Sequence, residues 1–438
     1  MVEIKYDFVM AENIKGGLTL NDFKKLEHKI NSAFNNLNKK CENNELGFMK
    51  CIYDDLSIYE EIKDYSKDFE NVVIIGMGGS VLGAQAVYEG VKGIYYNEFN
   101  NKDNKNNNKK VYFLDNSDPE KTYEILNIVN LEKTLIFAIS KSGNTAETLS
   151  NFLIFERKLK ETVTNYEKNI IIIANTGKLK EIAVNNNYKY ISISENVGGR
   201  FSVLSPVGLA PLCCLGIDIN KLIDGAKKVS ELCKSNDIFK NPSLLNATIH
   251  YLAHNNGKTI SVLMPYIERL HKFGLWYRQL WAESIGKKGV GQTPVVSIGA
   301  KDQHSQLQLY IDGPKDKIIT FMEVKNYKYD LDINGFDYLS NKKLSELIKY
   351  EKIGTEKALK NNNIPNISIN IETLDEYTLG MLIYFYEMTT AYIGELLEIN
   401  AFDQPAVEEG KIITRNLLGK NKINYDEKDI LNKYILKF

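Results

Sequence analysis

The hexapeptide SKSGNT, residues 140–145, gathers several groups that could bind an anion. The hydroxyls of Ser140, Ser142 and Thr145 suit the oxygens of a phosphate monoester, and Gly143 lets the backbone approach a ligand closely. An ordinary Ser/Thr/Asn turn followed by a helix cap is the alternative interpretation. The hexapeptide alone does not decide between a phosphate-binding loop and a turn.

The segments on either side of this hexapeptide indicate how it would be held. Residues 134–139 (TLIFAI) are apolar and are typical of a buried parallel strand, and residues 146–159 have the pattern of a helix. The hexapeptide would then lie at the carboxyl end of a strand and just before the N-terminus of a helix. Ligands bind at this edge of doubly wound sheets, and free backbone N–H groups at a helix N-terminus favour an anion.

A second glycine-rich turn, GMGGS at residues 76–80, follows a short apolar strand at 72–75 and precedes a helical segment at 81–91. This arrangement can hold an anion or a sugar near backbone amides, or it can simply allow tight packing between strand and helix. It is not a dinucleotide fingerprint, because Val81 stands where GxGxxG requires glycine. No GK[ST] follows, so it is not a Walker loop either.

Arg200 lies in NVGGRFSVLSP, after the last strand predicted in the first half of the chain. Two glycines beside it allow a sharp turn that aims the guanidinium into a cleft, where it could stabilise an oxyanion or hold a phosphate. A surface arginine beside a flexible turn is the alternative.

Glu283 lies near the end of an apolar helix, in WAESIGK. An apolar setting raises the basicity of a carboxylate, so the sequence predicts a general base there, and an ordinary charge at a helix end is the alternative. The apolar neighbours from which this setting is inferred are Tyr277, Leu280, Trp281 and Ile285.

His304 is the histidine best placed for acid–base chemistry, because it lies in a polar turn (DQHSQ) after a strand. The other four histidines fall on helical stretches, and a generic exposed histidine remains the alternative. Near the C-terminus, Gln404 and Lys411 in FDQPAVEEGK are seven residues apart, two helical turns, which predicts roughly one helix face. A charged helix end is the alternative for this pair.

Strands alternate with helices throughout the chain, which predicts an α/β fold with parallel sheets covered on both faces. Five strands are expected in the first half, at 72–75, 111–115, 134–139, 170–174 and 190–193, and four in the second, at 259–264, 294–298, 318–322 and 367–371. The predicted parts are a helical N-terminal arm (1–44) packing on the second domain, a first domain (45–218) and a second domain with C-terminal helices (219–438). The Asn/Lys-rich insert at 97–110 predicts a mobile surface loop.

Composition excludes several classes of protein. The 438 residues include 55 Lys and Arg against 56 Asp and Glu, so the charge surplus expected of a nucleic-acid-binding protein is missing. The five cysteines form no CxxC pair and have no metal-ligand spacing, which predicts reduced thiols in a cytoplasmic protein. Neither a signal-peptide core nor a membrane span is predicted, because the most apolar window, 203–217, is short and holds two prolines.

Taken in order, these motifs are distinctive. GGRFSVLSPVGLAP and GELLEINAFDQPAVEEGK closely resemble the two signature stretches of the glucose-6-phosphate isomerase (phosphoglucose isomerase) family. The resemblance extends from about residue 74 to 411, through IGMGGS, SKSGNT, GGRFS, WAESIGK, DQHSQ and FDQPAVEEGK in the family's order. The chain is shorter than the animal and yeast members, so it resembles a compact prokaryotic-type member in which the dimer-clasping extensions are reduced or absent.

The resemblance implies two sugar-isomerase (SIS) domains, flavodoxin-like αβα sandwiches with five-stranded parallel sheets. It also implies a homodimer that interconverts glucose 6-phosphate and fructose 6-phosphate through a cis-enediol, in glycolysis and gluconeogenesis, without a metal or organic cofactor. The catalytic and substrate-binding residues that it implies are Glu283 (base), Arg200 (enediolate), His304 and Lys411 (ring opening), Ser140, Lys141, Ser142 and Thr145 (phosphate), Gly79 and Ser80 (sugar), and Gln404 (phosphate or sugar).

Two rival hypotheses follow from the same resemblance: a bifunctional phosphoglucose/phosphomannose isomerase, and a non-catalytic SIS-domain regulator that only senses sugar phosphate. A regulator should keep the phosphate loop and lose the base or the acid, whereas Glu283, His304 and Lys411 are all present here. The family also implies that His304 serves the site of the partner subunit.

Overall fold

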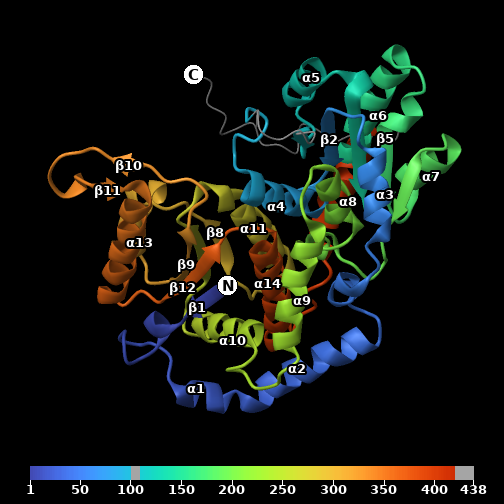
Figure 1. Cartoon of the computed structure of the whole chain (residues 1–438). Helices are drawn as coiled ribbons and strands as arrows, with labels where there is room; N and C mark the ends of the chain where they lie inside the picture. The colour runs from blue at the N-terminus through green and yellow to red at the C-terminus, as the bar shows by residue number, and fades with distance from the viewer. Residues whose placement is uncertain (100–108, 420–438) are drawn as a thin grey trace, which may run out of the picture. The chain divides into compact units, whose positions relative to one another are not determined.

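Two β-sheets organise the computed structural model, which describes residues 1–99 and 109–419 (Figure 1). Contacts divide the chain into two units, 1–401 and 402–438, and both sheets belong to the first. The described part of the second unit holds a 3-10 turn, η11 (Pro405–Val407), and the helix α15 (Glu408–Leu418). Most of the Asn/Lys-rich insert, and with it the loop predicted there, lies outside the described residues.

The first sheet is parallel throughout and follows the order β3-β2-β4-β5-β6. In chain order this is 2-1-3-4-5, the flavodoxin-like plan. Its strands are β2 (Asn71–Gly76), β3 (Lys110–Leu114), β4 (Thr134–Ser140), β5 (Ile170–Ala174) and β6 (Lys189–Ser192). The central strands are buried along their whole length, as continuous apolar runs in a sheet covered on both faces should be. Each strand predicted from the sequence is confirmed.

The second sheet has the same plan, except that its fifth strand is antiparallel and comes from the N-terminus. Its order is β1-β12-β9-β7-β8, built from β1 (Val2–Lys5), β7 (Ile260–Pro265), β8 (Thr293–Val296), β9 (Lys317–Asn326) and β12 (Asn366–Thr373). The strands β7, β8, β9 and β12 are parallel to one another and confirm the four strands predicted here. The fifth place is taken by β1, which pairs with β12 in the antiparallel sense. The expectation of a fully parallel second sheet was therefore wrong, because four residues of alternating VEIK are too short a signal to stand out.

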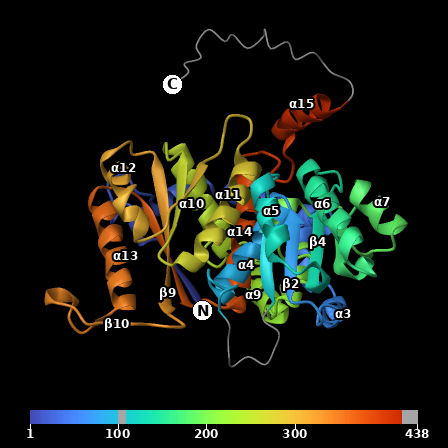
Figure 2. The same cartoon turned by 90° about the horizontal axis from the view of Figure 1, so that it is seen from above.

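Helices cover both faces of each sheet. In Figure 2 a central layer lies between the two sheets, formed mainly by α4 (Leu82–Lys92), α9 (Ile219–Cys233), α10 (Pro242–Asn255), α11 (His271–Ile285) and α14 (Glu376–Leu396). The outer face of the first sheet packs on α5 (Pro119–Ile128), α6 (Ala146–Thr162) and α7 (Gly177–Asn185). That of the second packs on α12 (Leu307–Asp312) and α13 (Leu344–Asn361). The predicted α/β fold is confirmed.

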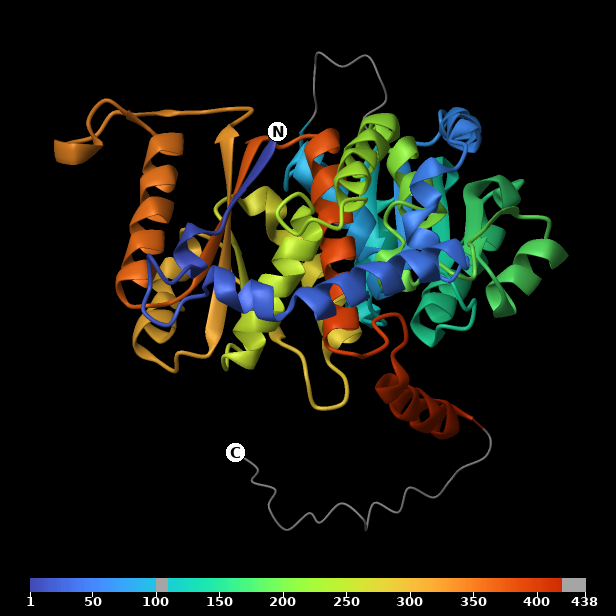
Figure 3. The same cartoon turned by 90° about the horizontal axis from the view of Figure 1, so that it is seen from below.

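The N-terminal helices α1 (Leu20–Lys25) and α2 (Glu27–Glu42) run along the central layer, where α2 contacts α10 and α14 (Figure 3). The helices α3 (Ser57–Tyr65) and α8 (Pro206–Cys214) pack on each other. The domain bounds at 44/45 and 218/219 fall inside the first unit and stay predictions. Across the described residues, no helix has both the length and the apolarity needed to cross a bilayer.

One buried acid in the central layer gives a prediction about stability. Glu387 on α14 is fully buried, and within the described residues neither carboxyl oxygen has a hydrogen-bond partner. Burial raises the pKa of this carboxyl well above its ordinary value. Its stabilising contribution is therefore complete below the pKa of the unfolded chain, and it is lost as the pH rises toward the folded-state pKa.

We therefore expect the Tm of the wild-type protein to fall relative to that of Glu387→Gln as the pH is raised from 5 to 8. The glutamine side chain is neutral throughout, so only the wild type must take up a proton when it folds. This uptake lowers its free energy of unfolding by up to about 1.4 kcal/mol per pH unit. Thermal melts of both proteins across this range check the prediction, and parallel curves of Tm against pH would contradict it.

Candidate functional site

The SKSGNT loop occupies the predicted place at the carboxyl end of β4. Ser140 is the last residue of the strand, and α6 begins directly after Thr145. The hydroxyls of these two residues lie 2.9 Å apart and are hydrogen-bonded. No side chain caps the N-terminus of α6, so its first backbone N–H groups remain available for an anion. The arrangement suits an anion held at the edge of the sheet.

The loop is braced by the connection between β5 and α7, a contact that no motif in the sequence predicts. Gly143 has φ of +62°, and a Cβ on it would lie 1.9 Å from the carbonyl oxygen of Thr176. Asn175 donates its backbone N–H to the Lys141 carbonyl at 3.0 Å, and Leu179 donates to the Gly143 carbonyl at 3.1 Å. Glycine is thus required by close backbone packing here, and the loop is preorganised.

Lys141 links this loop to the segment that leads to Arg200. Its ammonium donates a hydrogen bond to the Glu195 carbonyl at 2.7 Å. Burial lowers the pKa of this lysine. The predicted contact of Lys141 with a phosphate stays a prediction, and in this structure the side chain braces the loop.

Two glycine turns pack directly on each other beside the SKSGNT loop. They are the 3-10 turns η4 (Gly78–Ser80), which follows β2, and η7 (Gly199–Phe201). A Cβ on Gly79 would lie 2.1 Å from the carbonyl oxygen of Gly199, so only glycine fits. Since β2 and β4 are neighbouring parallel strands, Ser80 and Ser140 lie at the same edge of the sheet.

The guanidinium of Arg200 is buried and held on several sides. Its Nε donates to the Ser284 hydroxyl at 2.7 Å, and Nη2 donates to the Ala401 carbonyl at 2.6 Å. Its Nη1 lies 3.4 Å from the Glu283 carboxylate. These contacts to protein groups fix the plane of the guanidinium, and they do not depend on a bound substrate. The alternative of a flexible surface arginine is thereby excluded.

The carboxylate of Glu283 is 36% exposed and stands at the accessible side of this cluster. It also accepts a hydrogen bond from Nε2 of Gln279, one helical turn earlier on α11, at 3.3 Å. The predicted apolar setting is therefore wrong. The side chains of Leu280, Trp281 and Ile285 are buried in the core, whereas Glu283 faces polar groups. Spacing along the helix did not show which face each residue occupies.

His304 lies in the 3-10 turn η9 (Lys301–His304), before α12. Its side chain is exposed, and across residues 1–99 and 109–419 no hydrogen bond or ion pair joins it to another group. The structure thus places it in the predicted polar turn but does not join it to Glu283 or Arg200. Its catalytic role stays a prediction.

Gln404 and Lys411 belong to the second unit of the chain. Gln404 immediately precedes η11, while Lys411 lies on α15 and pairs with Glu408 at 2.7 Å. The expectation that they share one helix face was wrong, because the chain is not α-helical between 404 and 407. Their part in the site stays a prediction.

Two residues that the sequence analysis missed position the proposed base and cation. Gln279 holds Glu283, and Ser284 holds Arg200. Gln279 could have been found from its i, i+4 spacing to Glu283, since such residues are neighbours on a helix. Ser284 carried no comparable signal, because its partner is 84 residues away.

The sequence model described as phosphoglucose isomerase matches residues 43–315 and 337–430. The chain belongs to the phosphoglucose isomerase family. The matched ranges contain the SKSGNT loop, both glycine turns and the Arg200–Glu283 pair, so the geometry described above lies within the part of the chain that matches the family.

Individual relatives agree with this assignment. The chain is 50% identical to a probable glucose-6-phosphate isomerase of Methanococcus maripaludis, over 99% of this chain and 98% of that one. It is 46% identical to the glucose-6-phosphate isomerase of Methanocaldococcus jannaschii, over 95% and 99%. A solved structure of a hypothetical protein from Thermus thermophilus has a TM-score of 0.85 at 31% identity, covering 96% of this chain and 100% of that one.

The SKSGNT loop gives a prediction about binding. Changing Ser140 and Thr145 together to alanine should raise KM for fructose 6-phosphate far more than it weakens the binding of a neutral polyol. Each lost hydrogen bond to a charged group costs about 1.5–3 kcal/mol. Steady-state kinetics with the phosphate ester and competition with the polyol check this. An equal loss for both ligands would show that the loop has only a structural role.

Proposed function

We propose that this chain catalyses the reversible isomerisation of glucose 6-phosphate and fructose 6-phosphate, an aldose–ketose interconversion that needs no metal or organic cofactor. The observation that carries the proposal is the buried Arg200 guanidinium, fixed by Ser284 and Ala401, with the accessible Glu283 carboxylate 3.4 Å away. A proton transfer between adjacent carbons requires this combination of one carboxylate and one cation. The family and the named relatives support it.

In the proposed reaction the SKSGNT loop holds the phosphate and Glu283 removes the proton from C2 of the open-chain aldose. The electron pair of the C–H bond forms the C1–C2 double bond, and the C1 carbonyl oxygen gains negative charge. Arg200 stabilises this enediolate electrostatically. Glu283 then returns its proton to C1, while the C2 hydroxyl proton is transferred to O1. The product is the ketose.

The ring must open before this step. We assign that work to His304 and Lys411, following the family resemblance. Gly79 and Ser80 would contact the sugar, and Gln404 the phosphate or the sugar. Opening requires a proton to leave the anomeric hydroxyl and another to reach the ring oxygen, which a histidine and a lysine can carry.

The alternatives are less well supported. A non-catalytic sensor of sugar phosphate would not require a base held beside a fixed cation, yet Gln279 and Ser284 both serve this arrangement. Acceptance of mannose 6-phosphate depends on how the site treats the configuration at C2, so the assay below includes that sugar.

We further propose a cytoplasmic homodimer in which His304 completes the site of the partner subunit. The exposure of His304 fits this role. A short hairpin, β10 (Asp332–Ile333) and β11 (Lys342–Lys343), projects beyond α13 in Figure 1. The apolar side chains around it are highly exposed: Leu331 69%, Phe336 78% and Tyr338 75%. Clustered exposed apolar groups mark interaction surfaces, and we assign this one to a second copy of the chain.

A coupled assay tests the proposed activity. Purified protein treated with a chelator is supplied with fructose 6-phosphate, and glucose 6-phosphate is detected by its dehydrogenase. A parallel reaction starts from mannose 6-phosphate. We expect turnover of the first sugar without added metal. Binding of fructose 6-phosphate without turnover would favour the regulator, and comparable turnover of both sugars would establish the bifunctional enzyme.

A further inference from the structure

The second sheet has its own topological switch point, and a cavity lies beside it. In the first sheet the switch point falls between β2 and β4, whose following loops are GMGGS and SKSGNT. The corresponding strands of the second sheet are β7 and β9. Ligands of open α/β sheets bind outside the carboxyl ends of such strands. The carboxyl ends of β7 and β9 in the second sheet therefore correspond to the place where the first sheet carries the SKSGNT loop.

The cavity has a volume of about 390 Å³ and is lined by residues that follow both of these strands. Residues 267–269 follow β7 after one intervening residue, and residues 327–329 come directly after β9. The two loops touch, since the Tyr327 hydroxyl donates to the Tyr266 carbonyl at 3.3 Å. The C-terminal end of α4 and the residues after it form the remaining wall. The volume is suited to a small organic molecule.

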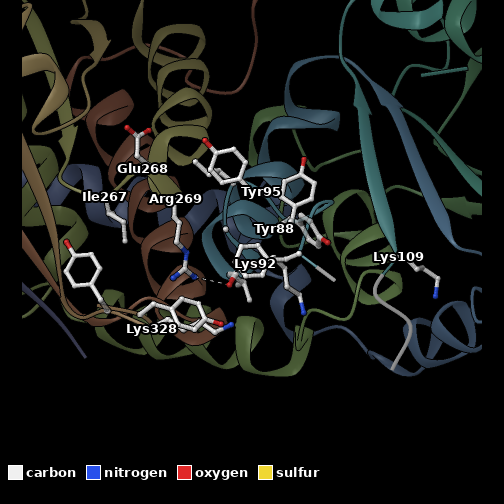
Figure 4. A pocket seen from close by; sticks show the side chains of 15 residues that line it. Tyr88, Lys92, Tyr95, Lys109, Ile267, Glu268, Arg269 and Lys328 are labelled. Carbon is white, nitrogen blue, oxygen red and sulfur yellow. Dashed lines mark hydrogen bonds between the residues drawn. The ribbon is translucent and has the colours of Figure 1, made fainter. Parts of the chain in front are cut away.

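Aromatic rings make up much of the lining (Figure 4). Tyr88 packs edge-to-face on Tyr96, with ring centroids 4.8 Å apart. Tyr95 and Tyr329 are 67% and 69% exposed, so the faces of their rings are accessible. Accessible aromatic faces stack well on planar ring systems, at a gain that tolerates many different rings. The lining therefore favours a ligand with a flat ring.

Four cations line the cavity with these rings. They are Lys92 at the end of α4, Lys109 just before β3, Arg269 after β7 and Lys328 after β9 (Figure 4). Arg269 donates to the Val91 carbonyl at 2.9 Å, and its buried Nε has no hydrogen-bond partner among the described residues. Glu268, the single acid among the described lining residues, is paired with Lys301 at 2.9 Å. The net positive charge favours an anion.

We propose that this cavity is a second ligand site, separate from the sugar-phosphate site, and that it binds a nucleoside monophosphate. The base would stack on the tyrosines, and the phosphate would be bound by Lys92 and Lys328. Lys328 and its neighbours lie in residues 316–336, outside the ranges matched by the family model, so the family pattern does not account for them. The catalytic groups Arg200 and Glu283 are not among the residues that line this cavity.

The test uses the whole purified chain and isothermal titration calorimetry with three probes: adenosine 5′-monophosphate, adenosine and inorganic phosphate. We expect saturable binding of the monophosphate, at least about tenfold tighter than that of either fragment, because ring and phosphate contribute together. The double variant Lys92→Glu/Lys328→Glu should weaken it at least about tenfold and leave isomerase kcat unchanged. The Tyr95→Ala variant should bind the monophosphate and adenosine more weakly, and by the same factor.

The control is a double charge reversal on exposed lysines elsewhere, Lys63→Glu/Lys67→Glu, which should bind the monophosphate as the wild type does. Three results would overturn the proposal: no saturable binding up to about 1 mM, inorganic phosphate binding as tightly as the nucleotide, or equal binding by the Lys92/Lys328 variant. Loss of binding in Ser140→Ala/Thr145→Ala, with binding intact in the lysine variant, would place the nucleotide in the sugar-phosphate site and also overturn it.

Discussion

Replacing Glu283 by glutamine should abolish isomerisation while leaving the binding of sugar phosphate largely intact. In the proposed reaction the carboxylate acts on a proton bound to carbon, whereas the SKSGNT loop holds the phosphate. Loss of a positioned general base commonly costs about 10²- to 10⁴-fold in rate. Glutamine keeps the size of the side chain, and its amide oxygen can still accept from Arg200, so the local structure should persist. The measurement is kcat in the coupled assay, with the Kd of fructose 6-phosphate measured separately.

A matched control is Glu60→Gln, which neutralises a side chain on α3 that is 62% exposed and pairs with Lys63. Its kcat should equal that of the wild type, since exposed ion pairs contribute little to stability. If the Glu283→Gln protein keeps more than about a tenth of the wild-type kcat, Glu283 is not the base.

The second large effect concerns assembly. The variants Glu283→Gln and His304→Ala should each be inactive alone and should regain activity when they are mixed and refolded together. In a shared-site dimer each mixed pair has one doubly damaged site and one intact site. Random pairing makes half the dimers mixed, and half of their sites work, so about a quarter of the wild-type activity should return.

The control for this experiment is mass analysis that confirms the mixed dimers. If every site is built within one chain, no pairing restores an intact site, and the activity stays at the sum of the two variants. That outcome would also leave the exposed His304 without the role assigned to it. Refolding each variant alone sets the background.

The framework of the fold could be predicted from the sequence because its strands are long apolar runs between polar turns. β2, β4 and β5 read as buried strands from composition alone, and the structure buries them fully. β1 could not be predicted in the same way, since it has four residues and depends on a partner strand more than 360 positions away, at Ile371.

In the site too, features set by neighbouring residues in the sequence could be predicted, and features set by tertiary packing could not. The SKSGNT loop was placed correctly, because its position follows from one strand and one helix that are adjacent in sequence. The surroundings of Glu283 were not, because they depend on which side of α11 meets η4 and η7, and this is decided by tertiary packing. Ser284 and the Thr176 carbonyl likewise act on residues far from them in the chain.

In the proposed reaction Glu283 moves a proton between C1 and C2 of a phosphorylated sugar. Nuclear magnetic resonance of fructose 6-phosphate incubated with the protein in D₂O tests it most directly. A proton held on a carboxylate exchanges with solvent, so deuterium should accumulate at C2 of the glucose 6-phosphate formed. The Glu283→Gln protein should give neither product nor deuterium. Glucose 6-phosphate that remains free of deuterium after many turnovers would contradict the account, because it would mean that the hydrogen never passes through an exchangeable base.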